Sequence, residues 1–359
     1  MPDIKAIAFY LPQYHPIPEN DQWWGKGFTE WTNVTKSKPL FKEHYQPHLP
    51  ADLGFYDLRL PEARQAQADL AREYGIHGFC YWHYWFHGKR LLESPVNEVL
   101  ALGEPDFPFC LAWANESWSR RWLGEDKEIL INQKYSQEDD TNHAEWLVHC
   151  FADPRYIKVY DRPLFLIYRP TSLPDPKATT KTIREVCQAS GLPNPYLVGI
   201  NAHSRHIDMR TLGFDCTEDH SPQLGVLPEA FNDDFSFNRL TRNIKRGIWD
   251  GELKIYDYAD AIQLMESSRP KYPHHPAFFV GWDNTARRQE KAIIMTDSHP
   301  DIVATHLAKV IESVGQSLLE ERIVFLNAWN EWAEGMYLEP NSLHGLRLLE
   351  AIRSVIQSD

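Results

Sequence analysis

Eight short apolar runs, most of them rich in β-branched and aromatic residues, recur along the chain and are separated by longer, more polar stretches. Runs of this length and composition are typical of strands that are buried on both faces. Buried strands that alternate with helical segments predict a parallel sheet, because parallel neighbours need a long crossover connection. The predicted strands are residues 4–10, 77–82, 107–113, 163–169, 196–201, 214–219, 277–282 and 323–329.

The stretches between these runs carry helical signals. Residues 61–75 begin with a proline suited to the first turn and end with a glycine, which is favoured just past a helix C-terminus. Residues 177–191 also end with a glycine, and residues 300–320 and 342–357 space their apolar side chains at the helical period. The chain therefore reads as alternating strands and helices.

Eight strand–helix units are the number found in a TIM-type barrel. The alternative, an open doubly wound sheet, usually has a glycine-rich turn after its first strand. Here that turn reads YLPQYHP (10–16), which contains no glycine and cannot cradle a pyrophosphate. The sequence thus predicts an α/β fold in which residues 1–359 form a single (β/α)8 barrel, with long loop insertions at the C-terminal face.

Two segments are too long to be simple connections. Residues 11–60 follow the first predicted strand and contain six prolines together with Trp23 and Trp24, and residues 219–276 follow the sixth strand. Long loops in a compact domain are usually functional or disordered, and aromatic-rich segments are poor candidates for disorder. Both segments follow the C-terminal ends of strands, where barrel active sites lie.

Composition narrows the class of ligand and the compartment. The net charge of −13 argues against nucleic acid, which needs a basic surface, while the aromatic share of 13% suits the flat faces of sugar rings. The five cysteines show no CxxC spacing, which predicts free thiols in a reducing compartment. The N-terminus lacks a signal-peptide pattern, and no apolar stretch approaches the roughly 18–20 residues of a membrane span. We therefore expect a cytoplasmic protein; its oligomeric state is not predicted.

In the predicted barrel, the residues that end each strand point into one shared cup. Aromatic, amide and carboxylate side chains stand at nearly every strand end. Aromatic faces stack on the C–H surfaces of sugars, and amides and carboxylates hydrogen-bond to hydroxyls. Any single aromatic there could instead cap the barrel core. The predicted saccharide contacts are Tyr10, Trp23, Trp24, Trp82, His83, Tyr84, Trp113, Asn115, Glu116, Tyr168, Trp282, Asn284, Asn330 and Trp332.

The stretch NAWNEWAEG (327–335) follows the eighth predicted strand and contains Glu331 and Glu334. If the chain turns helical there, these two residues share a face with Cβ atoms about 5–6 Å apart. Two carboxylates that close cannot ionise independently, so one acts as an acid and the other as a base. The alternative is an exposed acidic turn, but the stretch is too aromatic and too rich in amides for that. We predict that this pair is catalytic.

Other chemistries find little support in the sequence. His83 and His87 are four residues apart, but the stretch between them has no carboxylate that could serve as a further metal ligand. No GxSxG nucleophile elbow and no phosphate-binding P-loop occur. We expect neither a metal nor a cofactor.

Four motifs together resemble the WbsX-like proteins, which are often labelled glycosyltransferases of surface-polysaccharide loci. They are YLPQYHPIPENDQWWGKGFTEWTNV (10–34), HGFCYWHYWF (77–86), LAWANESW (111–118) and NAWNEWAEG (327–335). The fold of that group resembles that of family-99 glycoside hydrolases, the endo-acting α-mannosidases. The link to those hydrolases is more distant and rests on the barrel and on the spacing of the two glutamates in EWxEG.

The more distant resemblance implies a mechanism that retains the anomeric configuration through a 1,2-anhydro sugar. Glu331 would act as the base on the 2-hydroxyl of the substrate, and Glu334 would protonate the leaving oxygen and then activate water. This route needs a sugar whose 2-hydroxyl is trans to the leaving group, as in α-mannose or α-rhamnose. The expected activity is endo-acting hydrolysis of such a polysaccharide. A glycosyltransferase or transglycosylase of surface-polysaccharide biosynthesis and a non-catalytic sugar-binding barrel are the alternatives.

Overall fold

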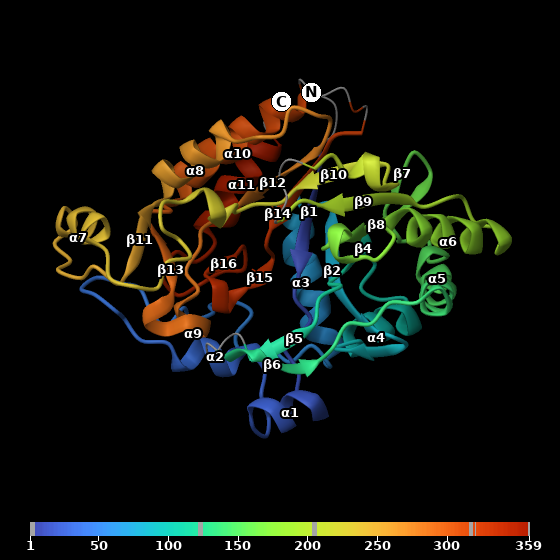
Figure 1. Ribbon diagram of the computed structural model, residues 1–359, viewed down its shortest axis with the longest axis horizontal. Coiled ribbons are helices and arrows are strands. Elements are labelled where there is room, and N and C mark those ends of the chain that lie inside the picture. Colours follow the sequence, from blue (N-terminus) through green and yellow to red (C-terminus); the bar gives the residue numbers. More distant parts are fainter. Residues whose placement is uncertain (1–3, 121–124, 203–206, 316–318, 320, 358–359) are drawn as a thin grey trace.

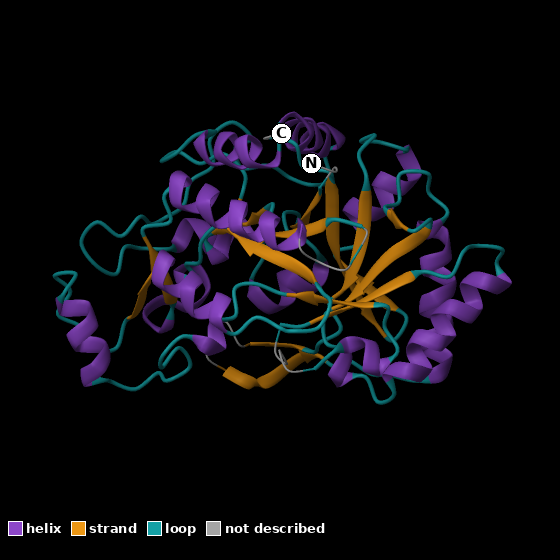
Figure 2. Cartoon of the chain, turned by 90° about the horizontal axis from the view of Figure 1, so that it is seen from above, coloured by secondary structure: helices purple, strands orange, loops and turns teal. Residues whose placement is uncertain are grey.

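The computed structural model describes residues 4–120, 125–202, 207–315, 319 and 321–357. Eight parallel strands pair side by side, and the first strand pairs with both the second and the last, which closes a barrel (Figure 2). The predicted (β/α)8 fold is therefore confirmed. The barrel strands are β1 (Lys5–Tyr10), β2 (Gly78–Phe86), β4 (Phe109–Trp113), β8 (Arg162–Ile167), β9 (Tyr196–Ile200), β10 (Cys216–Asp219), β12 (His275–Phe279) and β14 (Ile323–Asn327).

Successive residues of these strands face opposite sides of the barrel wall. Phe9 of β1 points into the barrel, where its ring stacks on Trp82 of β2 at 4.8 Å between centroids. Tyr10, the next residue, points outward and donates a hydrogen bond to Gln67 in the first long helix. Both faces are apolar and buried, which explains why the strands appear as continuous apolar runs in the sequence.

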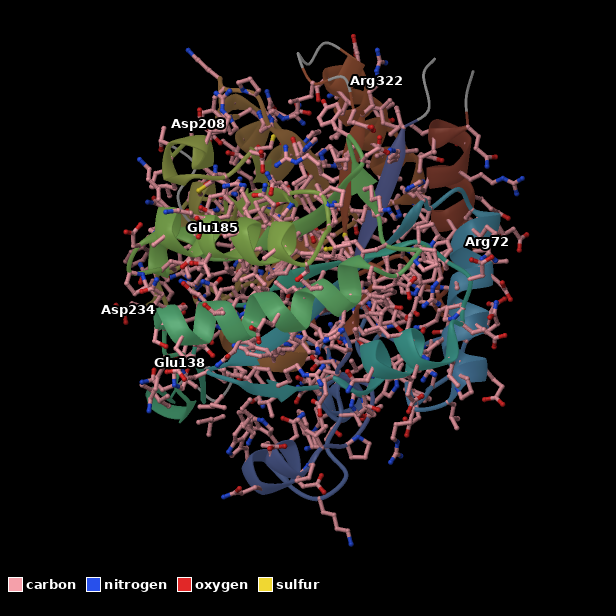
Figure 3. All side chains as sticks on the ribbon, turned by 90° about the vertical axis from the view of Figure 1, so that its right-hand side faces the viewer. Arg72, Glu138, Glu185, Asp208, Asp234 and Arg322 are labelled. Atoms are coloured by element: carbon pink, nitrogen blue, oxygen red, sulfur yellow. The ribbon has the colours of Figure 1, made fainter. Side chains whose placement is uncertain are left out.

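Helices surround the barrel, and their outer faces carry charged side chains such as Arg72, Glu138 and Glu185 (Figure 3). None of the helices formed by the described residues is both long and apolar enough to cross a bilayer. The surrounding α-helices are α3 (Pro61–Glu73), α4 (Ser94–Leu102), α5 (Gln137–Phe151), α6 (Pro176–Ala189), α8 (Tyr258–Ser267), α10 (Pro300–Gly315) and α11 (Arg347–Ile356).

The helix ends agree in part with the sequence signals. Gly75 lies just beyond α3 with a φ of +82°, as expected for a glycine that ends a helix. The helix predicted over residues 342–357 begins later, at Arg347, because Gly345 adopts a left-handed φ of +56° and breaks the helical path. Residues 316–318 and 320, at the end of the helix predicted over 300–320, lie outside the described residues.

The insertions gather at the C-terminal end of the barrel, at the bottom of Figure 1. The segment after β1, residues 11–60, forms two short helices, and further short elements follow β2, β4 and β12. These elements are α1 (Pro18–Trp24), α2 (Glu30–Lys36), β3 (Lys89–Leu91), β5 (Trp118–Arg120), β6 (Glu125–Ile131) and α9 (Thr285–Arg288).

The segment predicted as a long loop over residues 219–276 contains more regular structure than expected. It includes the short helix α7 (Phe237–Ile244), the strand β11 (Lys254–Asp257) and α8. β11 pairs in parallel with β13 (Ile293–Thr296) beside the barrel (Figures 1 and 2). The remaining short elements are β7 (Lys158–Val159), η2 (Pro170–Ser172), η3 (Met209–Leu212), η4 (Leu224–Val226), η5 (Gln289–Lys291), β15 (Asn330–Glu331), η6 (Trp332–Glu334) and β16 (Met336–Tyr337).

Candidate active site

The stretch NAWNEWAEG forms a tight hairpin beyond β14. β15 pairs with β16 in antiparallel fashion, and the single 3₁₀ turn η6 joins them. Gly335 ends the turn with a φ of +59°, and a Cβ at this position would lie 2.8 Å from the Cβ of Asp283. Only glycine fits both the backbone conformation and the space. The turn places Glu331 at its start and Glu334 at its end, three residues apart.

Both glutamates bind the same guanidinium, that of Arg287 in α9. The Nη2 atom of Arg287 lies 3.1 Å from Oε2 of Glu331, and Nη1 lies 2.5 Å from Oε1 of Glu334. The remaining donor, Nε, lies 2.8 Å from Oε1 of Glu30 in α2. The two side chains of the predicted catalytic pair are therefore adjacent, and a third carboxylate shares their cation.

The electrostatic environment favours the protonated form of both glutamates. Burial raises the pKa of Glu331 to about 8; Arg287 opposes this shift, and the neighbouring Glu334 and Glu30 add to it. Burial also raises the pKa of Glu334, again against the effect of Arg287. Because the two carboxyls interact, they titrate as a pair. A carboxyl with a pKa near neutrality, such as that of Glu331, can both give and take protons at physiological pH.

These side chains lie in a cleft of about 1070 Å³ at the C-terminal end of the barrel. A cleft of this size at this face of a barrel is the usual place of a small-molecule or glycan site. It brings together ten of the predicted site residues, which come from six of the strands or from the loops after them. The predicted residues that line it are Trp24, Trp82, Tyr84, Asn115, Glu116, Tyr168, Trp282, Asn284, Glu331 and Glu334.

Three predicted residues at strand ends do not line the cleft, because they lie on the outer face of the barrel wall. Tyr10 is buried against α3. His83 stacks on Trp146 of α5 at 4.5 Å between centroids and is a core histidine, and burial lowers its pKa well below the usual range. Trp113 is buried and donates from Nε1 to the Trp85 carbonyl.

Three more predicted residues lie close to the cleft without lining it. The side chain of Asn330 bonds to both the amide and the carbonyl of Leu11, which fixes the hairpin to the loop after β1. Trp332 is buried under the hairpin and donates from Nε1 to Glu339 at 2.6 Å. Trp23 packs edge-on against Trp118, at 5.9 Å between ring centroids.

The structure adds residues that the sequence prediction did not include. Glu30 and Arg287 complete the charged cluster, and His220 lines the cleft beside Tyr168. Nδ1 of His220 lies 3.3 Å from both carboxylate oxygens of Glu218, which is fully buried. In the sequence, Glu30 lies in the stretch GFTEW (27–31) and Arg287 in the stretch DNTARR (283–288). Neither stretch indicates that the two side chains meet in the fold.

Among the described residues, no three His, Cys, Asp or Glu side chains gather as a set of metal ligands.

Asp283 is a buried carboxylate that lies beside the hairpin and is stabilised by hydrogen bonds. Its Oδ2 accepts hydrogen bonds from Gln46 and His44 at 2.7 and 2.8 Å. Burial alone would raise the pKa of Asp283, but the hydrogen bond from His44 and the nearby His48 imidazole, 3.6 Å away, hold it well below its usual range. The main chain of Asp283 also donates to the Glu334 carbonyl at 2.7 Å, which supports the hairpin that carries the two glutamates.

A family model described as glycosyltransferase WbsX matches residues 6–352. The chain belongs to this family. Two relatives named WxcX, from strains of Xanthomonas campestris pv. campestris, are each 41% identical to the WbsX-family chain over 359 residues. The match covers 98% of this chain and 49% of each relative, so the chain spans about half the length of these curated relatives.

Solved structures with the same fold include a GH99 endo-α-mannosidase from Bacteroides thetaiotaomicron. It has a TM-score of 0.59 and 14% identity, over 97% of this chain and 95% of the other. A glycoside hydrolase-like protein has a TM-score of 0.62 and 13% identity, over 99% and 95% of the two chains. At this level of identity the likeness concerns the fold. The family description and these structures all concern proteins named for carbohydrate chemistry.

Proposed function

We propose that this WbsX-family chain is a retaining glycoside hydrolase that cleaves an α-mannose- or α-rhamnose-type polysaccharide from within, with Glu331 and Glu334 as its catalytic pair. The observation that carries the proposal is the pair itself. Two largely buried carboxyls, with side chains 10% and 21% exposed, share one guanidinium in a cleft lined by tryptophan and tyrosine. A pair of carboxyls, one of which is protonated and one ionised, is what glycosidic bond cleavage requires.

In the proposed reaction, the Glu331 carboxylate removes the proton from the sugar 2-hydroxyl. The 2-oxygen attacks C1, the bond from C1 to the leaving oxygen breaks, and Glu334 donates its proton to that oxygen. In the second half, Glu334 takes a proton from water, the water oxygen attacks C1, the bond from C1 to the 2-oxygen breaks, and Glu331 returns its proton to the 2-oxygen. A carboxyl with a pKa of about 8 is a stronger base than an ordinary glutamate, which suits removal of a proton from an alcohol.

The charges of the cleft favour a neutral saccharide over a sugar nucleotide. A nucleotide diphosphate needs cations that are available to its phosphates. The arginines that line the described part of the cleft are already paired with carboxylates. Nε of Arg169 lies 2.6 Å from Glu116, Arg287 binds three glutamates, and Arg288 lies 3.8 Å from Asp233.

The second candidate function is transfer of a sugar chain to another saccharide. The family description as a glycosyltransferase favours it. Transglycosylation would share the first half of the proposed reaction, and an acceptor hydroxyl would replace water in the second half. The same pair of carboxyls serves both outcomes.

Incubation with α-mannan- and α-rhamnan-type polysaccharides, without any nucleotide sugar, tests the proposal. We expect the release of oligosaccharides, detected by chromatography and mass spectrometry. New, longer saccharides formed from added acceptor oligosaccharides would favour transglycosylation. Turnover that strictly requires a nucleotide sugar would refute both of these functions.

A further inference from the structure

The charged cluster contains one more carboxylate than the proposed reaction uses. Glu30 comes from α2, inside the insertion after β1, and its side chain is completely buried. Oε1 of Glu30 accepts from Nε of Arg287 at 2.8 Å, and Oε2 accepts from Nε2 of Gln13 at 2.9 Å. Both oxygens are thus held in place by donors. Burial of a carboxylate beside two others is unfavourable unless hydrogen bonds or a cation compensate its charge, so its position calls for an explanation.

The geometry of Arg287 supplies that explanation. A guanidinium is planar, and its five N–H donors point in fixed directions. Once Glu30 binds Nε, the plane and the rotation of the group are set, and the two terminal nitrogens face Glu331 and Glu334. The elements α2, α9 and η6, which carry Glu30, Arg287 and Glu334, also contact one another directly.

We propose that Glu30 is a positioning residue for the proposed reaction: it holds the Arg287 guanidinium between the Glu331 and Glu334 carboxyls and so controls which protonation states the pair adopts. This inference rests on the proposed function for its catalytic meaning. The placement of Glu30 does not, because the contacts exist in the protein without substrate.

The charge of Glu30 acts on the pair in two opposite ways. It repels the ionised forms of Glu331 and Glu334 directly, and it anchors the cation that attracts them. Conversion of Glu30 to glutamine removes the repulsion and keeps an oxygen that can accept from Arg287. The pKa of Glu331 should therefore fall. The other titratable or charged groups that interact with the pair, which stay unchanged in this variant, are Tyr14, Tyr84, His220 and Arg287.

The first test titrates the Glu331 carboxyl directly by ¹³C NMR in the Glu30→Gln variant and in the wild-type protein. The resonance is assigned by its loss in Glu331→Gln. We expect the midpoint of the Glu331 titration to fall by about one pH unit in Glu30→Gln. A midpoint within 0.2 pH unit of the wild-type value, in a folded variant, would overturn the proposal. Glu321→Gln is the matched control, since it removes one carboxylate paired with Lys5 near the opposite end of the barrel.

A double-mutant cycle keeps the proposal testable if Glu30→Gln folds poorly. Arg287→Lys keeps the positive charge but removes the planar guanidinium, whose N–H donors bind Glu30, Glu331 and Glu334 in fixed directions. The loss of direct repulsion is common to both backgrounds, whereas Glu30 can anchor the guanidinium only where Arg287 is present, so Glu30→Gln should shift the titration midpoint by different amounts in the Arg287→Lys background and in the wild type. Equal shifts in both backgrounds would contradict a role through Arg287.

Turnover separates this inference from the proposed function. If Glu331→Gln and Glu334→Gln both retain wild-type turnover, the proposed function fails, whatever the titration shows. If both variants lose turnover but the midpoint of the Glu331 titration is the same in Glu30→Gln and in the wild type, only the positioning role fails. A merely structural role for Glu30 would lower the unfolding temperature without moving the midpoint.

Discussion

Conversion of Arg287 to methionine should destabilise the protein in a strongly pH-dependent way. Methionine keeps much of the volume of the side chain and removes the cation that three carboxylates share, at 2.5, 2.8 and 3.1 Å. The side chain of Arg287 is only 11% exposed, so solvent screens its three ion pairs weakly. Removal of one partner from a buried ion pair costs about 3–5 kcal/mol, because the remaining charge is left uncompensated.

The sign of the pH dependence follows from the carboxyls. The pKa of Glu331 in the folded protein, about 8, already exceeds its ordinary value of 4.5, and loss of Arg287 raises it further. A carboxyl whose pKa is raised by folding is favourable to folding when protonated, and its cost grows as the pH rises above the unfolded pKa. We therefore expect a loss of about 3–5 kcal/mol in unfolding free energy at pH 8 and about 1 kcal/mol or less at pH 5.

Urea denaturation at pH 5 and pH 8, followed by tryptophan fluorescence, measures both values. Arg72→Met is the matched control, because Arg72 pairs with Asp69 on the surface, where both side chains are about half exposed. This control should change the unfolding free energy by no more than about 0.5 kcal/mol at either pH. Equal losses for Arg287→Met at the two pH values would refute the view that Arg287 compensates buried carboxylates.

Three further predictions concern the hairpin that carries Glu331 and Glu334. If Glu331 acts as the base, kcat/KM should rise with pH through a midpoint of about 8, and a fall through that pH would assign it the acid role. Glu334→Gln should recover turnover on an aryl glycoside whose leaving group needs no protonation, whereas Glu331→Gln should not; rescue of the second variant instead would reverse the roles. Gly335→Ala should lower the unfolding free energy by about 1–3 kcal/mol, since it combines a left-handed φ with a contact of 2.8 Å to Asp283. An unchanged urea midpoint for Gly335→Ala would contradict the hairpin geometry.

The barrel could be predicted because its strands are buried on both faces. Such strands appear in the sequence as short apolar runs, and eight of them, separated by helical stretches, leave few other arrangements. All eight predicted strands overlap observed ones. The α7–β11–α8 segment was not anticipated, because the four residues of β11 are too few to stand out from a polar loop.

The strand-end residues were harder to assign, because a run that is apolar on both faces does not reveal which side chains point inward. Trp82 and Tyr84 line the cleft, while His83 between them faces α5. The same alternation places Tyr10 outside the barrel wall. To line the cleft, a residue must therefore both lie at the C-terminal end of a strand and point towards the inside of the barrel.

The central cation and its third carboxylate could not be predicted for a different reason. Glu30 and Arg287 are 257 residues apart in sequence and meet only because the insertions after β1 and β12 fold over the same strand ends. No local pattern marks such a pair. The two glutamates of the hairpin, by contrast, are three residues apart, so their proximity follows from the local chain alone.

The most direct measurement compares turnover and binding for Glu331→Gln and Glu334→Gln on whichever polysaccharide the wild-type protein cleaves. We predict that each substitution lowers kcat by at least about 100-fold on the natural polysaccharide, the usual scale for loss of a general acid or base. Binding of an oligosaccharide product, measured by calorimetry, should change by less than about tenfold. Turnover within about twofold of the wild-type value in either variant would contradict the assignment of this pair as the catalytic groups.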